Sequence, residues 1–343
     1  PDLLKQIALS FGDTLLHDSS TPGGATFNMH STSTQTFSKI NQQQWDYVVL
    51  QAQSQEPSFS SSQVANDTYP YAQQLISLIT ANDSCTEPIF FMTWGRKYGD
   101  QQNCQFYPPI CTYSGMQQRL RESYLEMTFN NNATCAPVGM AWKALIAMDS
   151  TINLYTSDNS HPSIYGSYLS ACTFYCTIFK KSCIGSTYWP NGIDSITALS
   201  LQTIASNKVL DSLSEWNIFN ADFSFSQFND SISCTNLSTN YESLVWDFGD
   251  GYFSFDENPV HTYNAPGIYT MSLTSLTNDG CLLDSIFSIV TVASTTTVEE
   301  DNSATKKLIK ITDVLGREVV PNSNQTLFYQ FNDGTTEKKI VVE

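Results

Sequence analysis

Two short apolar runs decide the fold of this chain, YVVL at residues 47–50 and IFFMTW at residues 89–94. Both runs are continuous rather than alternating, which is typical of parallel strands that are buried on both faces. A third, shorter run is expected around residues 137–139. Patterns of helical period lie between and after the runs, at residues 69–80, 113–129, 142–148, 163–179 and 193–210. Strands that alternate with helices predict a three-layer α/β domain over residues 1–210.

The pattern changes beyond this region. Residues 217–293 alternate apolar and polar positions between turns, around WDFGDG at residues 246–251, and this predicts an all-β sandwich. Residues 294–306 are rich in Thr, Ser and acids, which is typical of a flexible linker. Residues 307–343 predict three short strands around turns at Leu315-Gly316 and Asn332-Asp333-Gly334.

Charge and hydropathy exclude two classes of function. The formal net charge is -17, with only 16 Lys and Arg, so the chain lacks the basic surface that tracks a phosphate backbone. We therefore expect no nucleic-acid partner. No apolar run approaches the ~20 residues that cross a bilayer, so no transmembrane segment is expected.

Nine cysteines without a paired Cys-x-x-Cys knuckle favour disulfides in an exported protein over a metal site, and no metal or cofactor is expected. Cys104 and Cys111 bracket a Pro-rich loop, and Cys234 with Cys281 could staple the β region. Further candidates are Cys85 and Cys135, each placed before a predicted core strand. Free buried thiols remain the alternative for any pair, because connectivity cannot be read from sequence. Cys172 and Cys176 lie four apart on a predicted helix, where free thiols are favoured over a bridge.

Asp158-Asn159-Ser160-His161 precedes a long helical pattern. An aspartate three residues before a histidine, on a turn that opens a helix, can orient the imidazole as a general base. The alternative is a plain helix cap, in which Asp158 or Ser160 binds backbone N–H groups.

The stretch from Asp158 to Ser163 resembles the last sequence block of SGNH/GDSL-type hydrolases, in which Asp-x-x-His completes a Ser-His-Asp triad. Two other stretches agree with that family in order: residues 21–26, after the first helix and a short strand, and residues 47–57. The resemblance covers residues 1–205 and implies a flavodoxin-like hydrolase domain. It also implies catalytic roles for His161 and Asp158, oxyanion-hole roles for Gly24, Gln55 and Gln53, and a substrate pocket near Gln51, Ser54, Trp94 and Arg96.

This sequence departs from the family at two points. Gln55 stands where the family usually has an oxyanion-hole asparagine, with Gln51, Gln53 and Ser54 beside it, so the assignment among these residues stays open. The Gly-Gly turn, the Gln-rich strand end and Trp94 also have plain structural interpretations, as a turn, a solvated loop and rim packing. The nucleophile block, Gly-Asn-Ser or Gly-Asp-Ser, is expected just before Pro1, so residues 1–343 alone are expected to be inactive.

Two trailing segments resemble known modules. Residues 246–251, 258–263 and 267–269 resemble a PKD domain, which implies an immunoglobulin-like sandwich that acts as a spacer or as a polymer-adhering module. Its Asp247, Asp250 and Asp256 are expected to form turns rather than a calcium site, and His261 is expected to serve the fold. Residues 307–343, with Leu315-Gly316-Arg317 and Lys338-Lys339, resemble a type IX secretion sorting domain of Bacteroidota.

Together these features predict a secreted or outer-membrane, cell-surface SGNH-type serine esterase. Its expected partners are a carbohydrate or small ester substrate, from which it would remove O-acyl groups such as acetyl, and the type IX secretion machinery. The alternative is a non-catalytic exported protein with a hydrolase-like fold that binds polysaccharide or a surface. The sequence leaves open the substrate, the disulfide pattern, the oligomeric state and whether the tail is cleaved.

Overall fold

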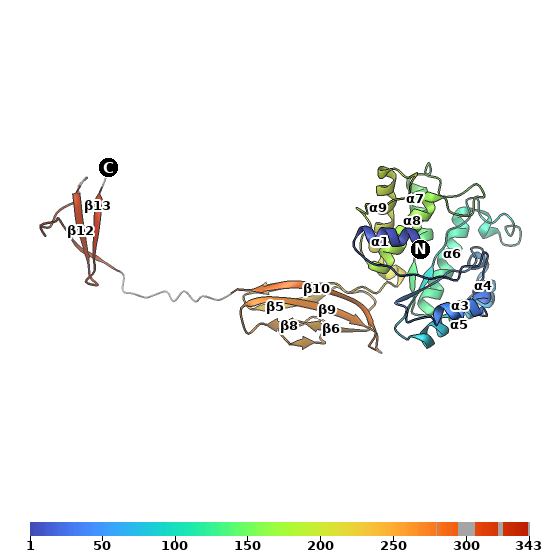
Figure 1. The fold of residues 1–343 in the computed structure, drawn as a ribbon, viewed down its shortest axis with the longest axis horizontal. Helices are drawn as coiled ribbons and strands as arrows, with labels where there is room; N and C mark the ends of the chain where they lie inside the picture. Colours follow the sequence, from blue (N-terminus) through green and yellow to red (C-terminus); the bar gives the residue numbers. More distant parts are fainter. Residues whose placement is uncertain (279, 294–305, 322–324, 342–343) are drawn as a thin grey trace. The chain divides into compact units, whose positions relative to one another are not determined.

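A computed structural model of the chain describes residues 1–278, 280–293, 306–321 and 325–341 (Figure 1). These residues form two compact units, Pro1–Val292 and Ala293–Glu343. Nearly all of the predicted linker, residues 294–305, lies outside the described residues.

The first unit begins with an α/β region built on a parallel sheet of order β1-β2-β3. Its strands are β1 (Tyr47–Leu50), β2 (Glu87–Phe91) and β3 (Thr134–Ala136). Figure 1 shows helices on both sides of this sheet, as a three-layer domain requires. The helices are α1 (Asp2–Ser10), α2 (Phe27–His30), α3 (Thr34–Ile40), α4 (Ser61–Asp67), α5 (Tyr69–Asn82), α6 (Tyr113–Asn130), α7 (Val138–Met148), α8 (Ile164–Phe179) and α9 (Ser195–Leu210). Three 3-10 turns, η1 (Glu56–Ser58), η2 (Pro108–Cys111) and η3 (Leu213–Trp216), complete the region.

The strand prediction at residues 137–139 is wrong by three positions. The third strand, β3, ends at Ala136, and Pro137 stands at the N-cap of α7 with a φ of -84°. Proline cannot donate a ladder hydrogen bond but suits the start of a helix, so the chain turns there. The short strand expected after the first helix is also missing, because residues 11–26 contain no helix or strand.

The core of the α/β region lies where the sheet meets its helices. Ile89 and Phe90 of β2 have no exposed surface, nor do Trp142 of α7 and Tyr168 and Tyr175 of α8. Burial of these side chains stabilises the fold by roughly 25 cal/mol for each Å² of apolar surface that is removed from water. This packing fixes the ends of the strands, from which the loops of the site extend.

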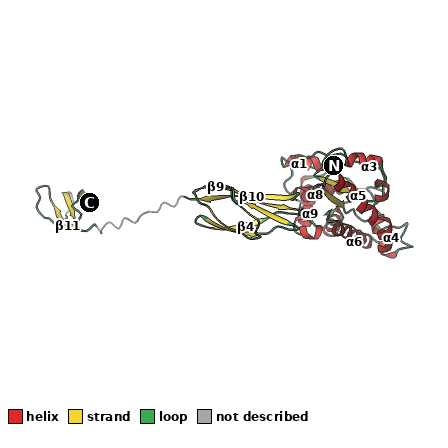
Figure 2. Cartoon of the chain, turned by 90° about the horizontal axis from the view of Figure 1, so that it is seen from below, coloured by secondary structure: helices red, strands yellow, loops and turns green. Residues whose placement is uncertain are grey.

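The remainder of the first unit is the predicted β-sandwich. Figure 2 shows it as strands without helices. One sheet has the order β10-β9-β6-β7 and the other has the order β4-β5-β8. Trp246, Met271 and Leu273 fill the space between them with no exposed surface. The strands are β4 (Phe223–Phe228), β5 (Ser231–Asn236), β6 (Ser243–Asp247), β7 (Phe253–Ser254), β8 (Val260–Thr262), β9 (Gly267–Leu276) and β10 (Leu282–Val292).

A disulfide between Cys85 and Cys281 joins the α/β region to the sandwich. The expected Cys234–Cys281 pairing is therefore wrong, because Cys281 bonds to Cys85 just before β2 and the buried Cys234 thiol contacts Met271 instead. Cys135 is not a disulfide partner either, since it is a free, buried thiol inside β3.

Polar contacts surround the same junction. The Lys180 ammonium donates to the Leu283 carbonyl at 2.8 Å and lies 3.6 Å from the Asp284 carboxylate. Lys180 keeps only 7% of its side-chain surface exposed, so this pair is largely desolvated. Together with the disulfide, it explains why Pro1–Val292 forms one compact unit.

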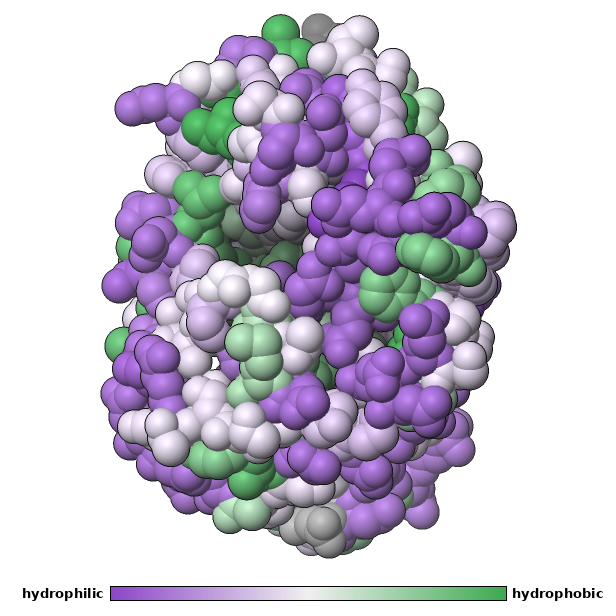
Figure 3. Space-filling model, turned by 90° about the vertical axis from the view of Figure 1, so that its right-hand side faces the viewer, coloured by the Kyte–Doolittle hydropathy of each residue, from purple (hydrophilic) through white to green (hydrophobic). Residues whose placement is uncertain are grey.

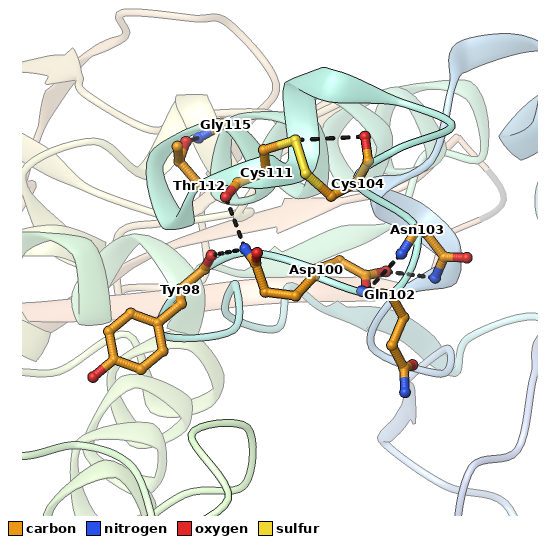
Figure 4. Close-up of a disulfide and its surroundings, with 9 residues drawn as sticks. Tyr98, Asp100, Gln102, Asn103, Cys104, Cys111, Thr112 and Gly115 are labelled. Atoms are coloured by element: carbon orange, nitrogen blue, oxygen red, sulfur yellow. Dashed lines mark hydrogen bonds between the residues drawn. A yellow bond between two sulfur atoms is a disulfide. The ribbon is translucent and has the colours of Figure 1, made fainter.

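Cys104 and Cys111 form the second disulfide, which closes the Pro-rich loop as the sequence analysis expects (Figure 4). Just before this loop, the Asp100 carboxylate accepts hydrogen bonds from the backbone of Gln102 and from the side chain of Asn103. Among the described residues, no helix is both long and apolar enough to cross a membrane.

The second unit is a three-stranded antiparallel sheet of order β11-β12-β13. Its strands are β11 (Leu308–Thr312), β12 (Gln325–Phe331) and β13 (Thr336–Val341). Gly316 and Gly334 have φ angles of 78° and 82°, which glycine adopts without strain. Both lie in the turns that the sequence predicts.

Candidate active site

Asp158 and His161 form a hydrogen-bonded pair on the loop before α8. The Asp158 Oδ2 lies 2.5 Å from the His161 Nδ1, and its Oδ1 accepts from the backbone N–H groups of Ser160 and His161 at 2.9 Å each. The hydrogen bond with His161 and these backbone bonds hold the pKa of Asp158 well below its usual range. The carboxylate therefore stays ionised, and it both shapes the loop and orients the imidazole.

The His161 ring is open to solvent, with 78% of its side-chain surface exposed. Because Nδ1 faces Asp158, the Nε2 atom is the one available for proton transfer. Within the described residues, no hydroxyl or thiol forms a hydrogen bond with this Nε2. The pair therefore has the geometry of a general base and its orienting carboxylate, without a nucleophile in contact.

The segment after β2 holds this loop in place. The indole N–H of Trp94 donates to the Ser160 carbonyl at 2.9 Å, and the Lys97 N–H donates to the Asn159 carbonyl at 3.0 Å. The Trp94 ring stacks on Trp142 with centroids 4.0 Å apart and planes 4° apart. The Asp158–His161 pair thus lies at the carboxyl edge of the sheet, where α/β proteins usually place ligands. Trp94 therefore supports the loop that carries His161.

The Gln-rich segment after β1 joins a second network at the carboxyl edge of the sheet. The Gln55 amide donates to the Asp100 carboxylate at 2.8 Å, and the Gln53 amide donates to the Gln55 side-chain oxygen at 3.0 Å. Arg96 pairs with the same Asp100 carboxylate at 3.5 Å. Burial alone would raise the pKa of Asp100, but hydrogen bonds from Asn103 and Gln55 outweigh it and lower that pKa.

These contacts separate the two glutamines that the sequence analysis proposes for the oxyanion hole. The Gln55 amide is engaged with the buried Asp100 carboxylate, whereas Gln53 also borders a surface hollow. An amide has two N–H donors, so Gln53 and Gln55 each retain one beyond these bonds. Asp100 is the residue of this network that the sequence analysis misses. Its only sequence signal is its position four residues after Arg96.

The hollow beside Gln53 has a volume of about 250 Å³. It is lined by Thr26, Gln53, Glu56, Phe59, Gln63, Asp67 and Thr68. Burial and the nearby Asp67 carboxylate raise the pKa of Glu56 to about 7, although a hydrogen bond from the Phe27 backbone lowers it in part. Glu56 and Asp67 carry no role in the sequence analysis. They make this hollow unfavourable for anionic ligands.

The other expected site residues have simpler surroundings. Gly24 is exposed with a φ of 70°, a conformation that favours glycine, and it lies two residues before Thr26 at the hollow. Gln51 is exposed, and Ser54 is half-buried in a turn. The structure gives no hydrogen bond that links His161 to Gly24 or to either glutamine among the described residues. Figure 3 shows a largely hydrophilic face with separate hydrophobic groups, as befits a polar, solvated surface.

The aspartates of the sandwich are engaged within the fold. Asp250 pairs with His261 at 2.8 Å, and the His261 ring stacks on Phe248 with centroids 4.1 Å apart. Asp247 accepts from the Gly249 backbone at 2.8 Å. In the described part of the chain, no group of three or more His, Cys, Asp or Glu residues could hold a metal ion.

Comparisons with known proteins agree with the two folds. Residues 224–292 match the family model of the PKD domain. A crystal structure of a DUF4886 family protein from Bacteroides uniformis is similar to this chain at 16% identity, with a TM-score of 0.52. That similarity covers 60% of this chain and 88% of the other, and it shows a shared fold.

Two further structures are more distant. A candidate SGNH hydrolase from Slackia heliotrinireducens is 24% identical over 50% of this chain and 89% of its own, with a TM-score of 0.39. A mutant of an acetyl-xylooligosaccharide esterase from Geobacillus stearmophilus is 15% identical over 50% of this chain and 75% of its own, with a TM-score of 0.35. No curated protein sequence matches this chain.

Proposed function

We propose that the α/β region is the hydrolase domain of an SGNH-type ester hydrolase. The observation that carries this proposal is the Asp158–His161 pair, an oriented and solvent-open imidazole at the carboxyl edge of a parallel sheet. A helix cap alone does not require the Asp158 Oδ2 to contact the imidazole, because the backbone bonds of the cap use Oδ1.

In this proposal His161 accepts the proton of a hydroxyl nucleophile as that oxygen attacks the ester carbonyl. Asp158 stabilises the imidazolium that forms, and the imidazolium then protonates the leaving alcohol. The Gly24 N–H and the Gln53 amide stabilise the developing oxyanion. Each such donor typically lowers the barrier by ~3–4 kcal/mol. In the second step His161 activates a water molecule, which hydrolyses the acyl ester and frees the nucleophile.

The nucleophile is a serine hydroxyl from outside Pro1–Glu343 in this proposal. The support is twofold: His161 Nε2 has no hydroxyl partner in the described residues, and β1 forms the edge of the described sheet. A strand that pairs with β1 would cover this edge and end close to the site.

The substrate class in this proposal is an O-acyl ester of a carbohydrate. The hollow beside Gln53 supports it, because Phe59 offers an apolar surface while Gln63 and Asp67 offer groups that bind sugar hydroxyls. Its two carboxylates disfavour phosphorylated or acidic substrates.

We also propose that the protein acts outside the cytoplasm. The PKD domain and the two disulfides fit an extracellular location. In this proposal residues 307–343 are a type IX secretion sorting domain, which would address the protein to the surface or medium of a Bacteroidota cell. Deletion of these residues in a type IX-competent bacterium should retain the protein inside the cell envelope, as cell fractionation would show.

Hydrolysis of p-nitrophenyl acetate tests the enzymatic proposal. The full-length gene product should hydrolyse the ester, and its His161→Ala variant should lose activity by ~10³-fold or more. A His30→Ala variant, which removes an imidazole elsewhere, should keep full activity. Equal rates for wild type and His161→Ala would reject His161 as the base. Absence of turnover in the wild type would favour the alternative, a binding protein with a hydrolase-like fold.

A further inference from the structure

Three buried thiols gather where α8 ends. Cys172 and Cys176 lie one turn apart on α8, Cys183 follows that helix, and none of the three has any exposed surface. Lys180 has a φ of 56°, which reverses the chain after α8 and brings Cys183 back to the helix. The three thiols form no part of the Asp158–His161 site.

Cys176 and Cys183 share one hydrogen-bond partner. The Ser206 hydroxyl lies 3.6 Å from the Cys176 Sγ and 3.3 Å from the Cys183 Sγ. The Cys183 backbone N–H also donates to this hydroxyl at 3.1 Å. The two sulfur atoms therefore converge on a single point of α9.

The printed contacts also distinguish the two thiols of α8. The Cys183 thiol donates to the Gln202 carbonyl at 3.3 Å, one turn before Ser206 on α9. Among the described residues, Cys176 is the α8 thiol that shares the Ser206 hydroxyl with Cys183.

We propose that Cys176 and Cys183 form a third disulfide in the mature protein. The inference rests on the proposed location outside the cytoplasm, where disulfides persist. Cys172 stays reduced beside this bridge. Burial raises the pKa of Cys176, so the folded protein holds little thiolate there, and the bridge forms while the chain folds.

The reaction balances with an oxidised thiol compound as co-reactant. The two thiols lose two protons and two electrons as the Sγ–Sγ bond forms. The disulfide of the co-reactant accepts both and becomes two thiols. Oxidised glutathione or a disulfide oxidoreductase supplies this chemistry.

The bridge would close a short loop that contains Lys180. Because Lys180 contacts Leu283 and Asp284 of the sandwich, the loop is part of the junction that the Cys85–Cys281 disulfide also secures. The third bridge would therefore fix the end of α8 at the same junction.

Thiol counting tests the inference without any activity assay, so it is independent of the esterase proposal. The 343-residue protein is folded in a buffer of reduced and oxidised glutathione, denatured without reductant and alkylated. Of the nine cysteines, three should react, Cys135, Cys172 and Cys234, and a peptide map should show the Cys176–Cys183 link. Five alkylated thiols, with only the Cys85–Cys281 and Cys104–Cys111 bridges present, would overturn the inference.

Variants sharpen the outcome. Cys172→Ser should keep the link and reduce the alkylated thiols from three to two. Cys176→Ser should instead raise them to four, because Cys183 loses its partner. A map that joins Cys183 to Cys172 in the wild type would also overturn the inference, as would a protein in which no cysteine is bridged.

Discussion

The indole N–H of Trp94 donates a 2.9 Å hydrogen bond to the carbonyl of Ser160, the residue directly before His161. Trp94 follows β2 by three residues, and its ring is held by stacking on Trp142 of α7. The position of the imidazole is therefore set by the sheet and its covering helix, and not by the Asp158–His161 loop alone.

Trp94→Phe should reduce ester hydrolysis of the full-length gene product by ~10-fold. Phenylalanine keeps the apolar ring but loses the donor, so the loop that carries His161 is held less firmly. The lost hydrogen bond should lower the free energy of unfolding by about 0.5–1.5 kcal/mol. Trp45→Phe is the matched control, because it removes an indole bond of 3.0 Å to the Lys39 carbonyl. Both variants should lose similar stability, but only Trp94→Phe should lose activity.

His161→Gln should raise the pKa of Asp158 toward the ordinary carboxyl value. The hydrogen bond with His161 is the largest cause of the low pKa, and the backbone bonds from Ser160 and His161 remain in the variant, so the return should be partial. A carboxylate whose pKa is lowered in the folded state stabilises the fold at pH values above the ordinary carboxyl pKa. This stabilisation is lost as the pH falls through the pKa of the folded state. Titration of carboxyl carbons by NMR measures the change. An unchanged Asp158 pKa would show that the imidazole does not interact with the carboxylate in solution.

Local patterns in the sequence predict the main strands and helices of the α/β region. The run at residues 47–50 is β1, and the helical periods at residues 69–80 and 113–129 are α5 and α6 with ends one or two residues longer. These segments are predictable because their apolar spacing and buried faces agree. The Asp158–His161 contact was predictable because both residues lie on one short turn.

Contacts between distant segments could not be predicted in this way. Cys85 and Cys281 are 196 residues apart, and nothing in either flanking sequence identifies the partner. The bond between Gln55 and Asp100 also spans two loops. The sequence carries only the order of such residues along the chain, whereas their pairing depends on how the loops pack.

Gly166→Ala should destabilise the start of α8. A Cβ at this position would lie 2.5 Å from the Leu154 carbonyl oxygen and 2.5 Å from the Trp142 ring, and neither backbone nor a buried indole can yield easily. Overpacking of this kind typically costs about 1–3 kcal/mol of unfolding free energy. Gly23→Ala is the control, since its Cβ would meet no atom within 4 Å. Chemical denaturation compares the two, and equal midpoints would contradict the close packing of Gly166.

Glu56→Gln should change how stability depends on pH. The folded pKa of Glu56 is raised to about 7, so the folded protein binds a proton that the unfolded chain has already released. Stability therefore falls as the pH rises from the ordinary glutamate value, about 4.3, toward 7, and stays low above it. The variant should melt at a higher temperature than the wild type at pH 8 and show a smaller difference at pH 5.

Asp67→Asn gives a second measure of the same hollow. Removal of the neighbouring carboxylate should lower the pKa of Glu56, because Asp67 is one of the two causes of its rise. The pH at which the melting temperature falls should then shift downward. Parallel melting profiles for the wild type and both variants would show that Glu56 ionises normally in the folded protein.

Loss of the Cys85–Cys281 disulfide should destabilise the protein more than loss of the Cys104–Cys111 disulfide. A cross-link restricts the unfolded chain more when it closes a longer loop, and the two bridges span 196 and 7 residues. In the loop-entropy account the difference is about 3 kcal/mol, within a typical total of ~2–5 kcal/mol for a native disulfide. The test compares the Cys85→Ser/Cys281→Ser and Cys104→Ser/Cys111→Ser double variants by chemical denaturation. If the short-loop variant were the less stable, the Cys104–Cys111 bridge would have to stabilise the folded loop around Asp100, and not act by restricting the unfolded chain.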